Sequence, residues 1–361
     1  MKKIVILIAF IMVNAMSYSQ LRQISVVSDI SKRETNEETK LALTDKNSTD
    51  YVLYRDVIRK YTWYEGVGTP ITQETADHLP FYFRLSMKNS AGHYLHIEAM
   101  YQNRMSNAHD KTTYVLDKLY DDDGTNKKWI DKLNTVAQWF FISDLTDNEV
   151  VEERAYTVDG DLVYSFVPVK NADGKIIGSY NDAWGLPVDM REDDSSTYGS
   201  VVCITYDECG RDHIIDFLDG QGLRKYNSNG VDQQRYLYDD KDRVILVTSH
   251  NLAGDYAIDN WGNCGNRYEY NDLDNSYSII IVDNELQPMR MPSTRADGTK
   301  TFIRCDIRRD IWGRNIEATM CDADGNADAT SSGIHKILYN YDEKGTLQSV
   351  SYYNMEGEKI N

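Results

Sequence analysis

The stretch Tyr236-Leu-Tyr-Asp-Asp-Lys-Asp-Arg-Val-Ile-Leu-Val247 contains the pattern that organises the second half of the chain. Its first three residues alternate, so the two tyrosine rings lie on one face of an extended strand. The aspartate after them predicts a turn, because its side chain can bond the backbone two residues on. The run Val244 to Val247 favours a second strand, since β-branched residues fit a pleated surface. The stretch therefore predicts a strand, a tight turn and a strand.

This pattern returns with a period of 32 residues. Tyr206, Tyr238 and Tyr270 open three units at that spacing, and Tyr341 opens another 71 residues after Tyr270. Arg309 divides the long interval into steps of 39 and 32 residues. Glycines recur sixteen residues after a start, where turns require them, at Gly222, Gly254, Gly325 and Gly357. One such unit cannot bury its own rings, so several units must stack into a continuous core.

The whole chain is therefore predicted to be mainly β. We expect an open array of about five 32-residue two-stranded repeats over residues 201–361, preceded by a β-meander over residues 146–200. Residues 50–145 are expected to form a small mixed α/β domain. Apolar residues at helical spacing favour one helix from Asp50 to Tyr61 and another from Trp129 to Phe140. Residues 20–49 are polar and charged, which is typical of a leader without a fixed fold.

The first nineteen residues have the three parts of a secretory signal peptide. Lys2 and Lys3 form a basic start, residues 4–13 are apolar, and serines stand at −3 and −1 before Gln20. The apolar run is too short to span a bilayer, which needs about 20 residues. A buried N-terminal helix is the alternative. We expect residues 1–19 to be removed, and the mature chain to be secreted, periplasmic or held at the cell surface.

Charge and cysteine usage limit the classes of function. The chain has 39 basic and 57 acidic side chains, a net charge of −18. This balance opposes binding to nucleic acid or to an anionic membrane, since both rely on Lys and Arg clusters. Five cysteines without a C-x-x-C pair suggest neither a zinc ribbon nor a thioredoxin-like site. An odd number leaves at least one thiol without a disulfide within the chain.

The units that open at Tyr238 and Tyr341 resemble the YD repeats of bacterial Rhs-type proteins. The run from Tyr341 to Gly357 is similar to the degenerate repeat arrays of exported bacterial proteins, and three Asp-x-Trp-Gly motifs have a faint likeness to the WG repeat. The resemblance covers about residues 150–361 and implies a repeat architecture. Some arrays of this kind precede a peptidase or another effector domain. The chain departs from the Rhs pattern in having too few units for a closed shell.

The tryptophans of the Asp-x-Trp-Gly motifs are the candidate binding residues: Trp184, Trp261 and Trp312. Exposed indoles stack on sugars and on peptide prolines, and a repeat array presents them in a row. The alternative is that these rings pack over the turns as part of the core, since large apolar rings are mostly buried.

One Asp-rich loop is a candidate calcium site. It runs from Asp322 to Asp328 and offers the carboxylates of Asp322, Asp324 and Asp328 around a glycine that permits a bend. The loop lacks the twelve-residue spacing of an EF-hand. The alternative is a solvated turn, because Asp and Gly are also what turns require.

No catalytic motif is present in the sequence. It contains no G-x-S-x-G, no glycine-rich phosphate loop and no H-E-x-x-H. His93 would face away from His96 and Glu98 on a strand, which argues against a shared metal there. We therefore assign no catalytic residue and expect no cofactor. The favoured hypothesis is an exported non-catalytic repeat scaffold that binds a protein or a glycan. The alternatives are a secreted hydrolase and the truncated stalk of a longer effector or peptidase protein.

The last strand of the array, Leu347 to Tyr353, is expected to have an open edge. Proteins normally cap, charge or cover such an edge, because its unpaired backbone groups can pair with another chain. We expect this edge to pair with a partner strand or with a second copy of the chain.

Overall fold

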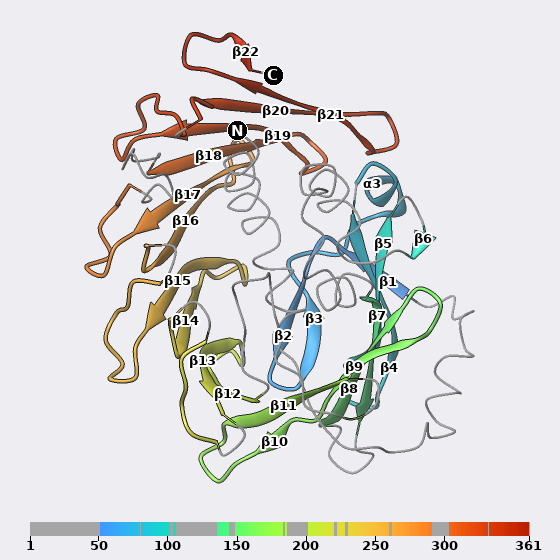
Figure 1. Cartoon of the computed structure of the whole chain (residues 1–361). Coiled ribbons are helices and arrows are strands. Elements are labelled where there is room, and N and C mark those ends of the chain that lie inside the picture. The colour runs from blue at the N-terminus through green and yellow to red at the C-terminus, as the bar shows by residue number, and fades with distance from the viewer. Residues whose placement is uncertain are drawn as a thin grey trace.

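The regular structure of the described residues is almost entirely antiparallel sheet, with very little helix (Figure 1). It holds one five-residue helix, α3 (Gln73–Asp77), and 22 strands. The computed structural model describes residues 51–79, 81–101, 104–105, 136–143, 149–182, 185, 201–219, 222–227, 230–259, 262–290, 303–330 and 332–360.

The strands fall into an N-terminal and a C-terminal set. The N-terminal set is β1 (Tyr51–Tyr54), β2 (Val57–Lys60), β3 (Trp63–Gly66), β4 (Tyr82–Lys88), β5 (Tyr94–Tyr101), β6 (Arg104–Met105), β7 (Val136–Ser143), β8 (Val150–Thr157), β9 (Leu162–Phe166), β10 (Val169–Lys170) and β11 (Ile176–Asp182). The C-terminal set is β12 (Val201–Tyr206), β13 (Asp212–Leu218), β14 (Gln233–Tyr238), β15 (Val244–His250), β16 (Gly265–Asn271), β17 (Ser276–Val282), β18 (Arg304–Arg309), β19 (Asn315–Cys321), β20 (Lys336–Tyr341), β21 (Leu347–Tyr353) and β22 (Lys359–Ile360).

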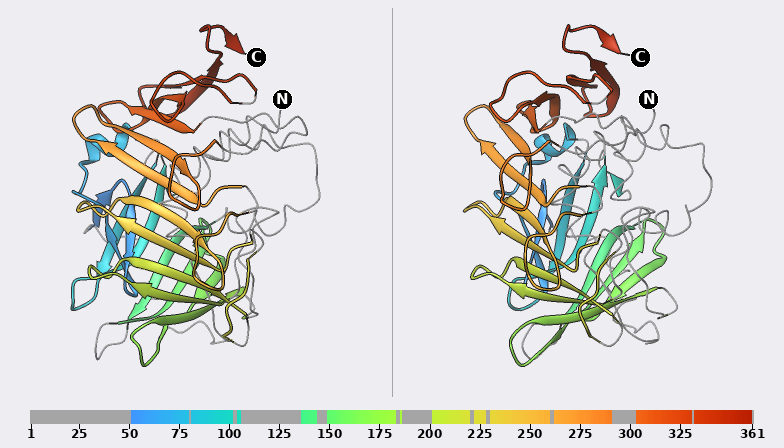
Figure 2. Two further views of the ribbon diagram at one scale, coloured as in Figure 1. Left: turned by 90° about the vertical axis from the view of Figure 1, so that its left-hand side faces the viewer. Right: turned by 60° about the vertical axis from the view of Figure 1, so that its left-hand side comes forward.

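From β11 onward each strand pairs antiparallel with the next in sequence, as the 32-residue period predicts. β11 also pairs with β9, which joins the array to the earlier strands in the order β9, β8, β7, β5, β4, β1. The sheet is strongly curved, and the hairpin β2–β3 lies inside the curve, between the two sets (Figures 1 and 2). The prediction of an open, mainly β array is confirmed.

The predicted helix from Asp50 to Tyr61 is wrong. Tyr51–Tyr54 is strand β1, paired with β4, and Val57–Lys60 is strand β2, paired with β3. The apolar spacing that favours a helix also fits two short strands separated by a turn. Asp56 makes that turn, since its Oδ1 accepts the backbone N–H of Val57 at 2.9 Å.

The second predicted helix, Trp129 to Phe140, is wrong where the structure describes it. Its last five residues belong to β7, which has β5 on one side and β8 on the other. A strand buried in this way reads as a continuous apolar run, and periodicity alone does not distinguish it from a buried helix. Residues 129–135, the leader 20–49 and the signal peptide lie outside the described residues.

One type of turn closes most of the hairpins. An Asp or Asn at its first position accepts the backbone N–H groups of the third and fifth residues, as Asp239 does from Lys241 and Arg243, both at 2.9 Å. The fourth residue has a positive φ, for example 79° at Gly210 and 61° at Asp242. The same pair of bonds is made by Asn89, Asn171, Asp207, Asn251, Asp283, Asp310, Asp322 and Asp342.

The hydrophobic core runs without a break through both sets of strands. One cluster joins Val57 and Tyr64 of the hairpin to Phe83 and Trp139 of the N-terminal set, and to Tyr236 of the repeats. The repeated tyrosines supply much of the C-terminal part of this core. This is expected, because one unit cannot bury its tyrosine rings alone. The hairpin β2–β3 therefore contributes to the same core as the array.

Candidate functional site

The turn arginine of one repeat connects it to the tyrosine of the next. Arg211 donates from Nε to Asp207 Oδ2 at 2.7 Å, and its Nη1 reaches Asp242 Oδ1 at 2.9 Å. Its guanidinium carbon lies 4.6 Å from the centroid of the Tyr238 ring. Such a contact is an attractive cation–π interaction. The same arrangement returns with Arg243 over Tyr270 and with Arg314 over Tyr341, at 4.1 and 4.9 Å.

The tyrosine hydroxyls form a second connection between repeats. Each donates to a backbone carbonyl 26 residues earlier, in the preceding unit: Tyr238 to Asp212 at 2.8 Å, Tyr270 to Val244 at 2.9 Å and Tyr341 to Asn315 at 3.0 Å. Both residues of the Tyr-Asp signature thus have a structural role. The aspartate forms the turn, and the tyrosine fastens that turn to the previous repeat.

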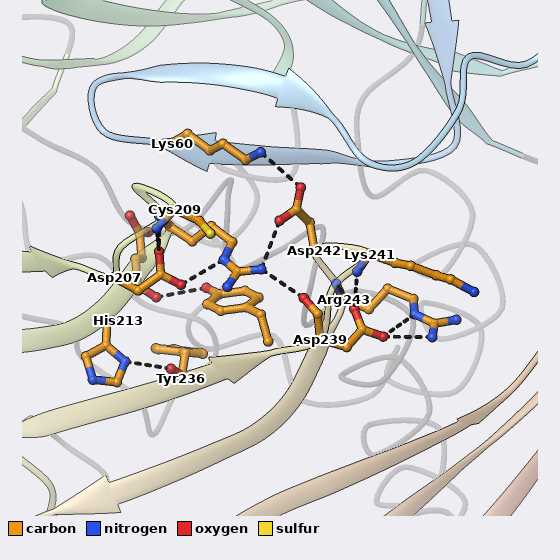
Figure 3. A network of polar contacts seen from close by, with 12 residues as sticks. Lys60, Asp207, Cys209, His213, Tyr236, Asp239, Lys241, Asp242 and Arg243 are labelled. Atoms are coloured by element: carbon orange, nitrogen blue, oxygen red, sulfur yellow. Dashed lines mark hydrogen bonds and ion pairs between the residues drawn. The ribbon is translucent and has the colours of Figure 1, made fainter.

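The hairpin β2–β3 contacts the turns of the first two repeats (Figure 3). Lys60 Nζ lies 3.0 Å from Asp242 Oδ2 and 3.1 Å from Glu65 Oε2. The backbone N–H of Tyr61 donates to Gly210 O at 2.7 Å. Asp242 therefore holds two cations, Lys60 from the hairpin and Arg211 from the neighbouring turn. This places the hairpin within the repeat network.

Beneath this contact is a buried group of charged and phenolic side chains. Arg59 of β2 lies 3.4 Å from Asp212 of β13, and both residues are almost fully buried. Burial works against the charge of Arg59, but Asp212 and its neighbours hold the pKa of Arg59 well above its ordinary value. Glu153 of β8 is also buried, and its Oε1 accepts the hydroxyl of Tyr164 at 3.5 Å.

The environment of Glu153 changes its protonation. Burial raises the pKa of its carboxyl from 4.5 to about 7, although Arg59 and the Tyr164 hydroxyl oppose that change. A carboxyl of this kind takes up and releases a proton near neutral pH. Because it is 2% exposed, its proton changes the internal electrostatics of the fold.

A second contact joins helix α3 to the fourth and fifth repeats. The His78 ring stacks on Trp312 with centroids 3.9 Å apart, and Arg314 Nη1 donates to His78 O at 3.2 Å. A Cβ at Gly345 would lie 2.5 Å from the same carbonyl oxygen. We call residues 54–79, which contact the turns of the first, second, fourth and fifth repeats, the hairpin segment.

The structure places one of the three candidate tryptophans. Trp312 is half-buried, stacks on His78 and packs against the small core of Leu53, Ala76, Leu79, Tyr82 and Met100. Its indole ring is thus used in packing, as in the alternative interpretation. Trp184 and Trp261 lie outside the described residues, and their binding role stays a prediction.

Two of the three candidate calcium ligands, Asp322 and Asp328, have other roles in the fold. Asp322 Oδ1 accepts the backbone N–H groups of Asp324 and Asn326, which is the common turn. The Asn326 side chain and these backbone bonds lower the pKa of Asp322. Asp328 forms an ion pair with Arg290. Within the described ranges, no group of three or more His, Cys, Asp and Glu side chains could hold a metal ion.

The remaining histidines considered from the sequence also have structural partners. His96 stacks on Phe140, Glu98 pairs with Arg84, and His93 stacks on Trp63, with β5 a strand as expected. None of the five cysteines forms a disulfide in the structure, and only Cys209 is exposed. His213 lies close to Cys209 in sequence, but its Nδ1 contacts Tyr236 O at 2.9 Å (Figure 3).

Sequence reasoning missed the residues at the centre of this site. Arg59, Lys60 and Glu153 belong to no motif, and Asp212 is one acid among many. One signal was available. Asp242 stands where the first, fourth and fifth units have glycine, and a non-glycine residue at a positive φ is uncommon; in the structure Asp242 also makes two ion pairs.

Comparison with known proteins gives no family. No family model and no curated protein matches the chain. Among solved structures it is similar to a chain in the complex of TcdB2, TccC3 and Cdc42, and to a chain in the Tc holotoxin pore of Photorhabdus luminescens. In both cases the identity is 12%, the match covers 78% of this chain and 14% of the other, and the TM-score is 0.28. So distant a likeness carries no argument about fold or function.

In the ranges given above, no helix is long and apolar enough to cross a bilayer.

Proposed function

We propose that the chain is an exported, non-catalytic repeat scaffold that binds a partner protein. The observation that carries this proposal is the network of turn aspartates, arginines and tyrosines. In the first, second and fourth units the turn arginine pairs with the aspartate of its own turn and lies over the tyrosine ring of the next unit. Such a network supports a rigid curved sheet.

The hairpin segment supports the same proposal. Lys60, Tyr61 and His78 fix the position of the repeat turns from inside the curve. A scaffold that presents binding residues from a rigid surface loses little conformational entropy when a partner docks. The ends of the strands opposite the Tyr-Asp turns then offer loops at regular spacing for contact.

A secreted hydrolase is the second candidate, and one observation favours it. Glu153 has a pKa of about 7 and lies in a group with Asp212 and Arg59. Carboxyls tuned in this way serve as general acids or bases in enzymes. Against this candidate, Glu153 and Arg59 are each 2% exposed, so a substrate would have to displace the hairpin to reach them.

The test compares the mature wild-type chain with Glu153→Gln. Both are immobilised, exposed to the exported protein fraction of the source cells and cross-linked, and both are assayed on peptide, ester and glycoside substrate panels. We expect the same partner to be retained by both chains in a saturable way, with no turnover. Turnover by the wild type that Glu153→Gln abolishes would establish the hydrolase instead.

A further inference from the structure

Two neighbouring loops expose several large apolar side chains. They follow β13 and β15, at the ends of the strands opposite the Tyr-Asp turns. The exposed fractions of the five side chains lie between 41% and 63%, with Leu223 the highest. We call this set the loop patch: Leu223, Tyr226, Leu252, Tyr256 and Ile258.

The two loops are in direct contact. Arg224 donates from Nη1 to Leu252 O and from Nη2 to Asn251 O, both at 3.2 Å. The same guanidinium lies 2.7 Å from the buried carboxylate of Asp232. The guanidinium of Arg224 therefore bonds both an aspartate of its own repeat and the backbone of the second loop, and it fixes the first loop against the second. The exposed side chains therefore lie on two loops that are fixed to each other.

The third repeat shows what these positions require for folding. Its loop closes in the same way, since the bridge Val282–Pro288 repeats the bridge Leu218–Arg224. The third repeat, however, has Gln287 at the position equivalent to Leu223 of the first repeat. It has Asn284 at the position equivalent to Leu252 of the second repeat. Arg290 likewise stands at the place of Tyr226 and of Ile258.

This comparison within one chain separates folding from function. Gln287 and Asn284 form the same loop with polar side chains, so apolar residues are not a requirement of the backbone. Exposed apolar side chains gathered on one surface mark interaction sites in soluble proteins. The exposed apolar side chains of the first two repeats therefore indicate a role in binding and not in folding.

We propose that the loop patch is the docking surface for a protein segment that combines apolar anchors with Lys or Arg. This rests on the proposed scaffold function and names its binding site. Three of the five side chains are aliphatic, which favours a protein partner over a glycan, whose recognition depends on aromatic platforms and hydrogen bonds. Protein interfaces enclose an apolar centre in a polar rim.

Charge determines which protein segment fits. The chain has a net charge of −18, and the exposed Asp255 stands between Leu252 and Tyr256 in the second loop. A second copy of the chain would bring the same negative charge to the contact, and like charges across an interface are unfavourable. A basic segment gains from the same field, which also steers its approach.

The experiment uses the full mature chain and a phage-displayed library of random twelve-residue peptides as the probe. Enriched peptides are synthesised with a fluorescent label, and their affinities are measured by anisotropy. The test variant combines Leu223→Gln with Leu252→Asn, which copies the third repeat and leaves the net charge unchanged. The matched control is Met355→Asn, because Met355 occupies the place of Leu252 in the fifth repeat and is 52% exposed.

We expect enriched peptides to contain Lys or Arg together with Leu, Ile or aromatic residues. We expect the double variant to bind them at least about tenfold more weakly, as for the loss of a central apolar anchor. Met355→Asn should bind with wild-type affinity. Unchanged melting temperatures show that both variants fold, and the unchanged net charge excludes a loss of general attraction.

Three results would overturn the proposal. If the double variant binds the peptides as tightly as the control, the loop patch is not the site, but the scaffold function stands. If a glycan array yields ligands that Tyr226→Ala removes while no peptide is enriched, the partner class is wrong. If neither peptides nor glycans bind, and no partner is cross-linked from the exported fraction, the proposed function fails as well.

Discussion

Replacing Gly345 by alanine tests the contact between the hairpin segment and the last repeat. Gly345 has a φ of 76°, and an added Cβ would lie 2.5 Å from His78 O and 2.8 Å from His78 C. Both atoms belong to the backbone, so no side chain can move aside to relieve the overlap. Gly357→Ala is the matched control in the same repeat, because its φ is 80° and nothing lies within 4 Å of its added Cβ.

The two variants should differ by the energy of the contact. An alanine in the left-handed region costs about 1–2 kcal/mol, and both variants bear this cost. In Gly345→Ala the His78 backbone must also move away. It then loses the bond from Arg314, about 1.5–3 kcal/mol for a charged donor, and the stack on Trp312, about 0.5–1.5 kcal/mol. The extra destabilisation is therefore about 2–4.5 kcal/mol.

Urea unfolding followed by tryptophan fluorescence gives the two free energies, and hydrogen exchange locates the change. The amides of Ala76, His78 and Leu79 bond Thr72 O, Thr75 O and Ala76 O, so they should exchange faster in Gly345→Ala alone. Equal free energies of unfolding for the two variants, with the same exchange at these amides, would refute the reasoning.

Four further outcomes can be checked. Because burial raises the folded pKa of Glu153 from 4.5 to about 7, its contribution to stability is complete below pH 4.5 and is lost as the pH rises through 7. At about 1.4 kcal/mol per pH unit this amounts to about 3–4 kcal/mol. Thermal unfolding of Glu153→Gln should therefore show a flatter pH profile between pH 4.5 and about 7. A double-mutant cycle of Lys60→Met and Asp242→Asn should give a coupling energy of about 0.5–1 kcal/mol that falls in high salt, since this pair is partly exposed. A coupling energy of zero would show that the ion pair does not stabilise the fold. Mass spectrometry of exported material should find a mature N-terminus at Gln20, whereas an intact Met1 would contradict the signal peptide. Light scattering should show self-association of the mature chain at high concentration that deletion of residues 346–361 abolishes, and a full-length chain that stays monomeric would rule out the edge pairing.

The array could be predicted because its determinants are local and repeated. The turn at Asp239 depends on residues within four positions of it, and the strands it joins pair with their sequence neighbours. Every unit repeats the same pattern of turn and strand residues. A single departure, such as Arg309 at a start position, therefore does not obscure the period. The strand from Leu347 to Tyr353 was also expected, and it is β21. One edge of β21 pairs with β20 along its length, and the other edge pairs with β22 only at Tyr352 and Tyr353.

The hairpin segment could not be predicted in the same way. Its structure depends on partners far along the chain, such as Asp212 for Arg59 and Asp242 for Lys60. Short strands such as Val57–Lys60 contain too few residues for a clear period, and helical spacing matched them by coincidence. Contacts with distant residues therefore determine the structure of this segment, for which the local pattern predicts a helix.

The contact between His78 and Arg314 has a consequence for the order of assembly on the ribosome. The two residues are separated by 236 positions. At a synthesis rate of about 5–20 residues per second, the partner of His78 is made roughly 10–50 seconds after it. The repeats, whose pairings are local, can form as they emerge, whereas the hairpin segment waits with its edges and apolar side chains uncovered. The earliest part of the sheet to be made is thus the last to be completed, and this interval is when the nascent chain most needs protection from aggregation.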